Sequence, residues 1–323
     1  MLFWLLRIIP AAVIIALLIR HSNLSWQILQ GFDWRFLTAA AMVLLTQNVL
    51  VALRWWWILR AMHIKIAFFT VLSLSMQGLF FMLFLPGGTV GADVCKAALM
   101  AVASAEDAKI DAVFTVLVDR LCGFAGLLVL SFFSAFFFFF RQHYPFAGNL
   151  GHLLQGVLIA APAILVCMWG AINVDFLLKI GVLKKIYDWL DRRSNGFFTR
   201  CRNCLITTRA AGKTLLQAVS FSTLVTFPLI ILSVYLIGCS FAGGGNAVFY
   251  GALASGSIGE LAGAIPLTPG GIGVRDALFV QCFQMCGLGK EAATLISLTF
   301  TALMFITGSL GAFFALHMLW RKR

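Results

Sequence analysis

Long apolar runs alternate with short polar segments from one end of the chain to the other. A helical crossing of a bilayer takes about 20 apolar residues, and six runs reach or approach that length. They lie at about 2–19, 36–53, 112–140, 152–172, 214–238 and 291–320. This pattern predicts an all-α, polytopic integral membrane protein with about six full transmembrane helices, the first of them retained rather than cleaved as a signal peptide.

Two further apolar regions, 66–111 and 246–288, are each interrupted in the middle by a Pro-Gly-Gly turn. Each half is short for a full crossing, so each region is predicted to form a re-entrant helical hairpin. Two tilted or kinked spans would leave the ends of the region on the same sides of the membrane. The predicted topology is therefore the same under both interpretations.

Composition agrees with a membrane protein and limits the chemistry. The 323 residues are 61% hydrophobic and 11% charged, whereas a soluble domain has about 25% charged residues. A separate soluble catalytic domain is therefore excluded. Most of the eight cysteines lie in apolar runs, and Cys201 and Cys204 have no second pair or nearby histidine to complete a metal site. No cofactor, ATP-binding loop or metal is predicted.

The net charge of +12 is concentrated between the apolar runs. The segment 175–213 has nine Lys or Arg residues against three Asp residues, which is half of the net charge. The positive-inside rule places this segment and the basic tail 321–323 in the cytoplasm, so both termini are predicted to be cytoplasmic, in a bacterial-type inner membrane. Anionic lipid headgroups are the expected partners of this face, and nucleic acid is excluded because there is no folded basic domain.

Other charges agree with this orientation. Arg54, Arg60 and Lys65 fall on the cytoplasmic side, and the three consecutive tryptophans 55–57 are predicted to lie at the inner interface, where indole rings favour the headgroup level. The sparsely charged segments 141–151 and 239–246 fall outside.

Counting crossings predicts that the first hairpin is entered from the cytoplasm and the second from the outside, which is an inverted repeat. The two turns share the pattern P-G-G-x4-D, at 86–93 and 269–276. Nine positions before each proline a polar side chain interrupts the apolar run, Gln77 in one copy and Glu260 in the other. A chance match between two Gly-rich turns is the alternative.

The chain is accordingly predicted to be a single transmembrane domain, 1–323. Its first repeat spans about 36–140, a basic connector spans 175–213, and the second repeat spans about 214–320. Apolar residues recur along the connector at spacings of four and three, namely Phe176, Ile180, Leu183, Tyr187 and Leu190. This stripe suits a helix lying in the inner interface, or equally a cytoplasmic helix packed on the protein.

The two breaks are candidate substrate-binding elements. Non-helical backbone inside a bilayer is expected where it lines a cavity, and the N-terminus of the helix that follows attracts an anion such as a lipid phosphate. The residues concerned are Pro86, Gly87, Gly88, Pro269, Gly270 and Gly271. A simple packing turn between helices is the alternative.

Charged side chains in apolar segments are the other candidates, because a charge at the centre of a bilayer costs about 2.5–3.5 kcal/mol. With Gln77, they are Asp93, Lys96, Asp119, Arg120, Glu260, Arg275 and Asp276. Lys96 and Arg275 are predicted to contact phosphate. Asp119 and Arg120 are adjacent in a helix and are expected to face different partners, within a structural ion-pair network or beside substrate. Glu260 either exchanges protons or holds the hairpin together.

The phrase Ile265–Asp276, with the earlier Pro86–Asp93 turn, Lys96 and the Asp119-Arg120 pair, resembles the lysylphosphatidylglycerol synthase transmembrane family. The resemblance covers nearly the whole chain and implies a lipid-translocating membrane domain with two re-entrant hairpins. Asp276 stands where the family often has Glu, and Lys96 where Arg is common. Lys keeps the charge but lacks the bidentate grip of Arg on a phosphate.

The resemblance implies a lipid flippase, with a phospho- or aminoacyl-lipid as cargo in a central hydrated cavity between the hairpins. The chain ends three residues after Trp320, without the soluble domain that makes aminoacyl lipids, so it is not expected to be an enzyme. The alternatives are an intramembrane enzyme or synthase subunit acting on a lipid-linked substrate, and a non-catalytic scaffold. A homo-oligomer or a complex with a lipid-synthesising enzyme is compatible with each.

Overall fold

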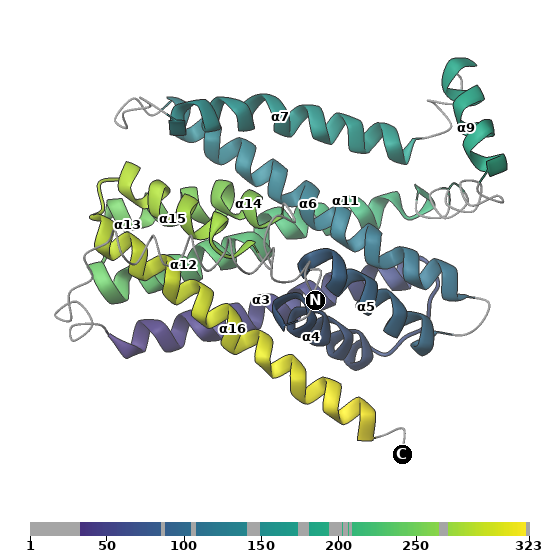
Figure 1. Ribbon diagram of the computed structural model, residues 1–323, viewed down its shortest axis with the longest axis horizontal. Helices are drawn as coiled ribbons and strands as arrows, with labels where there is room; N and C mark the ends of the chain where they lie inside the picture. The colour runs from purple at the N-terminus through teal and green to yellow at the C-terminus, as the bar shows by residue number, and fades with distance from the viewer. Residues whose placement is uncertain are drawn as a thin grey trace.

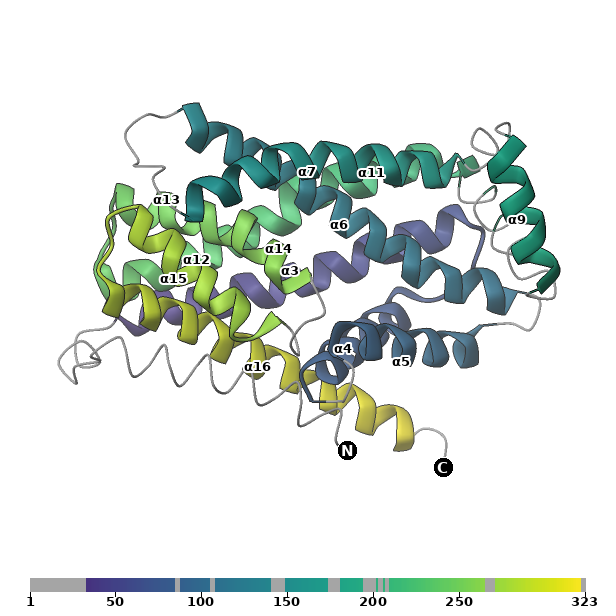
Figure 2. The same ribbon diagram turned by 45° about the horizontal axis from the view of Figure 1, so that its top comes forward.

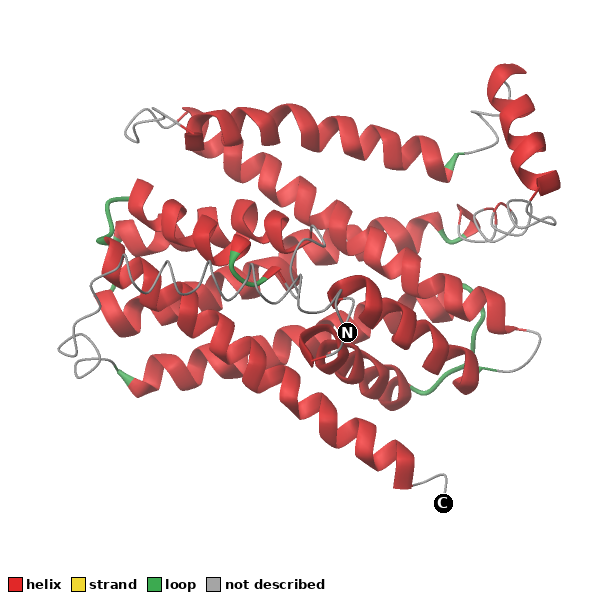
Figure 3. Cartoon of the chain, in the orientation of Figure 1, coloured by secondary structure: helices red, strands yellow, loops and turns green. Residues whose placement is uncertain are grey.

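The computed structural model describes residues 33–84, 88–104, 108–140, 149–173, 181–193, 202, 206, 209–264 and 271–320. Within these ranges the secondary structure is helical and contains no strand (Figure 3). Five helical segments are long and apolar enough to cross a membrane: Trp34–Ala61, Lys109–Phe140, Gly151–Gly170, Gly212–Ala242 and Lys290–Ala315. The prediction of an all-helical membrane protein is confirmed. The predicted first span, 2–19, lies outside the described residues.

The long helices run roughly along the long axis of the molecule (Figures 1 and 2). They are α3 (Trp34–Ala61), α6 (Lys109–Phe140), α7 (Asn149–Ile172), α16 (Lys290–Trp320), and a composite span of α11 (Gly212–Phe221), the π-helical turn η2 (Ser222–Thr226) and α12 (Phe227–Ala242). α3 packs along α12, and α7 packs on α6. The apolar side chains between these helices form the core.

Two groups of shorter helices occupy the interrupted regions. The first contains α4 (Phe68–Phe84) and α5 (Gly88–Ala103). The second contains α13 (Asn246–Ala254), the π-helical turn η3 (Ser255–Gly259), α14 (Glu260–Ala264) and α15 (Val274–Met285). In both Figure 1 and Figure 2, α4 and α5 lie in the right-hand half of the molecule, while α13 and α15 lie in the left-hand half.

Glycines allow the shorter helices to pack closely against their neighbours. A Cβ on Gly311 of α16 would collide with the Met76 carbonyl of α4, and a Cβ on Gly308 would collide with Leu83. In the second group, a Cβ on Gly259 would come within 2.8 Å of Phe279. These close approaches fix α4 against α16 and η3 against α15.

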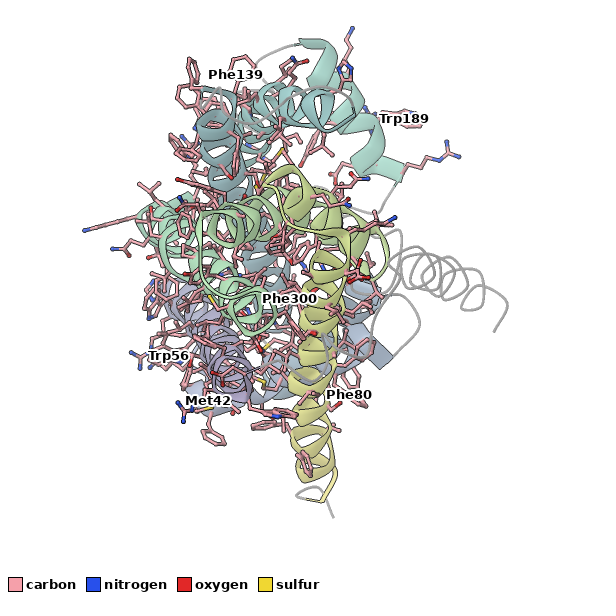
Figure 4. All side chains as sticks on the ribbon, turned by 90° about the vertical axis from the view of Figure 1, so that its left-hand side faces the viewer. Met42, Trp56, Phe80, Phe139, Trp189 and Phe300 are labelled. Atoms are coloured by element: carbon pink, nitrogen blue, oxygen red, sulfur yellow. The ribbon has the colours of Figure 1, made fainter. Side chains whose placement is uncertain are left out.

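Side chains at the surface of the bundle are largely apolar, as expected for a protein that faces lipid. Figure 4 shows Phe139 and Trp189 pointing outward, while Phe300 lies inside. Phe139 is 46% exposed and Phe300 only 1% exposed.

Part of the predicted connector forms the helix α9 (Gly181–Arg193). It stands across the direction of α7 at one end of the bundle (Figures 1 and 2). Trp189 on α9 is 56% exposed. This orientation is the one expected for a helix that lies along the membrane surface. Phe176 and Ile180 of the predicted stripe lie outside the described residues.

The helix that carries the three tryptophans is longer than its apolar run, and Trp55 lies inside the bundle. The first described span extends to Ala61 rather than ending near 53, so the three tryptophans belong to the helix. Trp55 is fully buried, and its Nε1 donates a hydrogen bond of 3.0 Å to Thr115 Oγ1 on α6. It is a core residue, because its side chain packs toward α6 rather than toward the outside of the bundle.

Candidate functional site

Asp276 anchors the start of α15, the helix that follows the second break. The N-cap residue of α15 is Gly273, which has φ +88°. Its backbone N–H donates a hydrogen bond to Asp276 Oδ2 at 2.8 Å. Asp276 Oδ1 accepts hydrogen bonds from Ser297 at 2.8 Å and Thr301 at 2.7 Å, both on α16. Both carboxylate oxygens are therefore engaged, and Asp276 ties the helix N-terminus to α16.

Arg275, one residue earlier, is 1% exposed. Its Nη2 donates to Thr301 Oγ1 at 2.6 Å, and its Nη1 lies 2.7 Å from Met304 Sδ. The guanidinium carbon lies 5.0 Å from the centre of the Phe300 ring, within the range of a cation–π contact. These contacts hold the guanidinium of Arg275 in place but leave its Nε without a hydrogen-bond partner in the described structure.

Glu260 faces Arg275 from the other arm of the hairpin. The distance from Glu260 Oε1 to Arg275 Nη1 is 3.9 Å, which is an ion pair but too long for a hydrogen bond. Glu260 Oε1 also has no hydrogen-bond partner in the described structure. A buried polar atom left unsatisfied costs about 1–3 kcal/mol, so one such atom on each member of the ion pair suggests that a further polar group belongs there.

Two glycines lie beside this pair. Gly263 lies next to both side chains: a Cβ there would stand 3.7 Å from Arg275 Cδ and 3.7 Å from Glu260 Oε2. Gly271 has φ +74°, and a Cβ on it would collide with the Gly263 Cα. Glycine at 271 is required by this close approach of the two arms, and the sequence had not drawn attention to Gly263.

The π-helical turn η3 directly precedes Glu260 and is held by α6. Ser257 Oγ donates to Ser134 Oγ at 2.8 Å, and Ser131 Oγ donates to the Ser257 carbonyl at 3.0 Å. π-turns within α-helices are frequent at functional sites. Here the turn sets the direction in which Glu260 projects.

The first hairpin has a different arrangement of charges. Arg120 of α6 binds Asp93 of α5 through two hydrogen bonds, Nε to Oδ2 at 2.8 Å and Nη2 to Oδ1 at 2.9 Å. The side chains are 47% and 34% exposed. This bidentate pair joins the two helices at a partly exposed position.

Lys96 lies deeper in the same region. Its Nζ is 3.8 Å from the centre of the Trp55 ring, a cation–π contact. Its aliphatic chain passes Gly78 of α4, where a Cβ would stand 3.5 Å from Lys96 Cδ. Among the described residues Lys96 makes no ion pair within 4.0 Å, so the ammonium retains its capacity to bind an anion.

Lys96 and Arg275 do not occupy equivalent positions. Lys96 is the ninth residue of α5, whereas Arg275 is the second residue of α15. With the two turns aligned on their prolines, Lys96 falls opposite Phe279 and Arg275 opposite Ala92. Lys96 therefore lies about two turns into its helix, because α5 already begins at Gly88, whereas Arg275 lies in the first turn of α15.

Asp119 takes part in a buried network that the sequence did not reveal. Arg54 of α3 donates from Nε to Asp119 Oδ1 at 2.9 Å and from Nη1 to Ser222 Oγ, in η2, at 2.7 Å. The Arg54 and Asp119 side chains are each 6% exposed. Arg54 lies within α3 and bonds inward, where Gly123 leaves space for its guanidinium.

The prediction that Asp119 and Arg120 face different partners is confirmed, because Asp119 bonds Arg54 and Arg120 bonds Asp93. Gln77 is 2% exposed, and its Nε2 donates to Ser73 Oγ at 3.0 Å. Gly88 begins α5 with φ +54°. The other residues of the two turns, Pro86, Gly87, Pro269 and Gly270, lie outside the described residues.

The ends of the two hairpins meet through apolar side chains. Leu83, near the end of α4, and Ile272, just before α15, belong to one small buried cluster, with Met82 and Phe305 packed against it. Leu83 is 8% exposed and Ile272 is 7% exposed. The segments next to the two breaks are therefore in contact at the centre of the molecule.

In the part of the chain that is described, no group of three or more His, Cys, Asp or Glu residues is arranged to hold a metal ion. Neither a curated protein nor a solved structure matches the chain. A family model does match: "Lysylphosphatidylglycerol synthase TM region" aligns with residues 4–312. That match covers nearly the whole chain, including both interrupted regions, and the chain therefore belongs to the lysylphosphatidylglycerol synthase transmembrane family.

Proposed function

We propose that this membrane domain is a translocase that moves a polar-headed lipid, a phospholipid or an aminoacyl lipid, between leaflets of a cytoplasmic membrane. The headgroup passes between two re-entrant hairpins related by inverted repetition, while the acyl chains remain in the bilayer. Both termini are cytoplasmic, and the protein performs no covalent chemistry on its cargo.

The packing of the helices supports the inverted repeat. If α3, α4, α5 and α6 correspond to α11–α12, α13–α14, α15 and α16, then each contact in one half has a counterpart in the other. The pair α5 with α6 corresponds to α15 with α16, and α4 with α16 corresponds to α14 with α6. The contact between α3 and α12 joins two equivalent elements and would lie on the symmetry axis.

The single observation that carries the proposal is the buried pair of Arg275 and Glu260. Both have a polar atom without a partner in the described structure, and the guanidinium sits at the N-terminus of α15, where the helix dipole also favours an anion. A lipid phosphate would satisfy Arg275 Nε. Glu260 would bind a cationic headgroup amine or a proton and so balance the charge.

In this proposal the Leu83–Ile272 cluster is the closed gate between the two halves. The cluster joins residues that lie next to the two breaks, so separating them opens a path between the hairpins. Lys96, which is partly exposed and lies above Trp55, serves as a second phosphate contact in the first half.

The test uses the purified full chain in liposomes that contain a small fraction of fluorescent phosphatidylglycerol. Reduction of the dye from outside measures how fast inner-leaflet lipid reaches the outer leaflet. Arg275→Gln and Glu260→Gln should slow this exchange about tenfold, because loss of a charge-assisted hydrogen bond costs about 1.5–3 kcal/mol.

Two matched controls make the same chemical change elsewhere. Arg35→Gln alters an exposed arginine at the start of α3, and Glu291→Gln alters an acid in the first turn of α16. Both should transport at the wild-type rate. Only variants with wild-type unfolding temperatures are compared, and equal rates for all four variants and the wild type would remove Arg275 and Glu260 from the mechanism.

A further inference from the structure

A groove of about 730 Å³ opens on the outer surface between α3 and α11, away from the Arg275 site. One wall comes from one face of α3, including Trp57 and Arg60, and the other from one face of α11 and η2. The residues that matter on the second wall are Thr214, Gln217, Ser220 and Leu224. Their spacings of three, three and four place them in a row along the helix.

The groove changes from polar to apolar along the two helices that form its walls. Arg60 lies in the last turn of the span Trp34–Ala61, and Thr214 lies near the start of the span Gly212–Ala242, so both are at the same end of the bundle. Leu224 is ten residues beyond Thr214, about 15 Å further into the span, and is 73% exposed. A phospholipid has the same polarity sequence, with a headgroup at the interface and acyl chains below it.

The polar lining has unused hydrogen-bonding capacity. Within the described ranges, Arg60 forms no ion pair, and the side chains of Thr214, Gln217 and Ser220 form no hydrogen bond. The Arg60 guanidinium lies 4.1 Å from the centre of the Trp56 ring, which orients it while leaving its donors free. A cation with free donors at this position is complementary to a phosphodiester.

The walls of the groove are held in place from behind. Trp57 and Phe221 meet edge to face at 4.9 Å, and the Arg54–Ser222 hydrogen bond links α3 to η2 one turn deeper. Ligand binding therefore requires little reorganisation of the two helices, which favours affinity.

We infer that this groove binds one anionic phospholipid, with its phosphate at Arg60 and the nearby hydroxyl and amide groups, and one acyl chain along Leu224. The groove faces the surrounding bilayer rather than the space between the hairpins. The lipid bound there is thus a resident ligand and not the cargo, and the inference stands independently of transport.

Native mass spectrometry of the full chain in detergent, titrated with phosphatidylglycerol or phosphatidylcholine, tests this inference. The wild type should retain one phosphatidylglycerol several-fold more strongly than phosphatidylcholine. Arg60→Gln should weaken phosphatidylglycerol retention about tenfold. Arg60→Lys should be intermediate, because it keeps the charge without the bidentate geometry.

Arg35→Gln, at the opposite end of α3, is the matched control and should retain the lipid as the wild type does. Equal retention by Arg60→Gln and Arg35→Gln, or no preference for the anionic lipid, overturns the inference. Disulfide cross-linking of two chains through Gln217→Cys also overturns the inference, because a second copy of the chain, rather than a lipid, would then occupy the groove.

A second measurement places the lipid. Phosphatidylglycerol with a photoreactive acyl chain, in liposomes with the full chain, should label the peptide that contains Leu224, and Arg60→Gln should reduce this labelling. Labelling elsewhere alone contradicts the inference. Arg275→Gln should leave labelling unchanged, so failure of the transport proposal and failure of this inference are distinguishable.

Discussion

Asp119 and Arg120 are neighbours on α6 but belong to different environments. Asp119 is buried against Arg54, whereas Arg120 binds Asp93 at a position where both side chains are about one-third to one-half exposed. Breaking a buried pair leaves an uncompensated charge in a low-dielectric environment, which is far more costly than losing a solvated pair. The two adjacent residues should therefore differ sharply in their effects on stability.

Asp119→Asn should lower the free energy of unfolding by about 3–5 kcal/mol, because Arg54 is left buried without its counter-charge. Arg120→Gln should lower it by less than about 1 kcal/mol. Thermal unfolding in detergent, followed by dye binding to newly exposed cysteines, measures both. The double variant Arg54→Gln with Asp119→Asn should be less destabilised than the sum of the single variants, and strict additivity would argue against a coupled pair.

Arg54 also shows where prediction from the sequence ends. It lies just before three tryptophans at the end of an apolar run, which is the usual place for a cytoplasmic charge. Its partners Asp119 and Ser222 are 65 and 168 residues away, and no local pattern links them. By contrast, adjacent residues of a helix must point in different directions, so the divergence of Asp119 and Arg120 was predictable.

At the scale of elements, glycines decide how closely the helices of different segments approach. α4 rests on α16 at Gly308 and Gly311, and the second hairpin closes where Gly271 meets Gly263. Small residues allow such approach in membranes, where helices gain little from hydrophobic association and rely on packing. The seam between α4 and α16 joins the first hairpin to the last helix of the chain.

Gly311→Ala should destabilise the protein by about 1–3 kcal/mol, because the new methyl group would meet the Met76 carbonyl. Gly156→Ala on α7 is the matched control: a Cβ there meets nothing within 4 Å, and alanine in an exposed helix gains about 0.5–1 kcal/mol over glycine. Unfolding temperatures should therefore shift in opposite directions. A similar shift for both variants would contradict the close approach of α4 and α16.

The elements themselves were largely predictable, because apolar run length determines helix length. Helices occupy both interrupted regions; α5 begins at Gly88, the last residue of the first Pro-Gly-Gly turn, and the second turn falls between α14 and α15. The sequence did not predict the division of the second hairpin by η3, or the contact between Leu83 and Ile272. Both depend on side chains of other helices that fill the space around them.

For the whole molecule, the important feature is that the two hairpins occupy opposite ends of the bundle (Figures 1 and 2). The segment before α4 contains the exposed Lys65, and the segment before α13 contains the exposed Gly244. If the long axis of the bundle crosses the bilayer, these two entry points lie on opposite sides of the membrane. The proposed path of a headgroup between the hairpins depends on this arrangement.

Single cysteines at Lys65 and Gly244, in a chain whose native cysteines are replaced by serine or alanine, test the arrangement. A membrane-impermeant maleimide should label Gly244→Cys in intact cells and Lys65→Cys only in inverted vesicles. Labelling of both from the same side would rule out hairpins that enter from opposite faces. A wild-type unfolding temperature of the cysteine-free parent is the control that its fold is intact.

The π-helical turns η2 and η3 have a consequence for how this chain tolerates changes in length. Each wide turn accommodates one more residue than an α-helical turn and absorbs it locally, so the helix beyond the turn keeps its orientation. Deleting one residue from 222–226 should therefore restore regular winding and leave α12 against α3, and deleting one from 255–259 should leave Glu260 beside Arg275. A deletion in the regular α-helix on either side would instead rotate everything beyond it by about 100° about the helix axis.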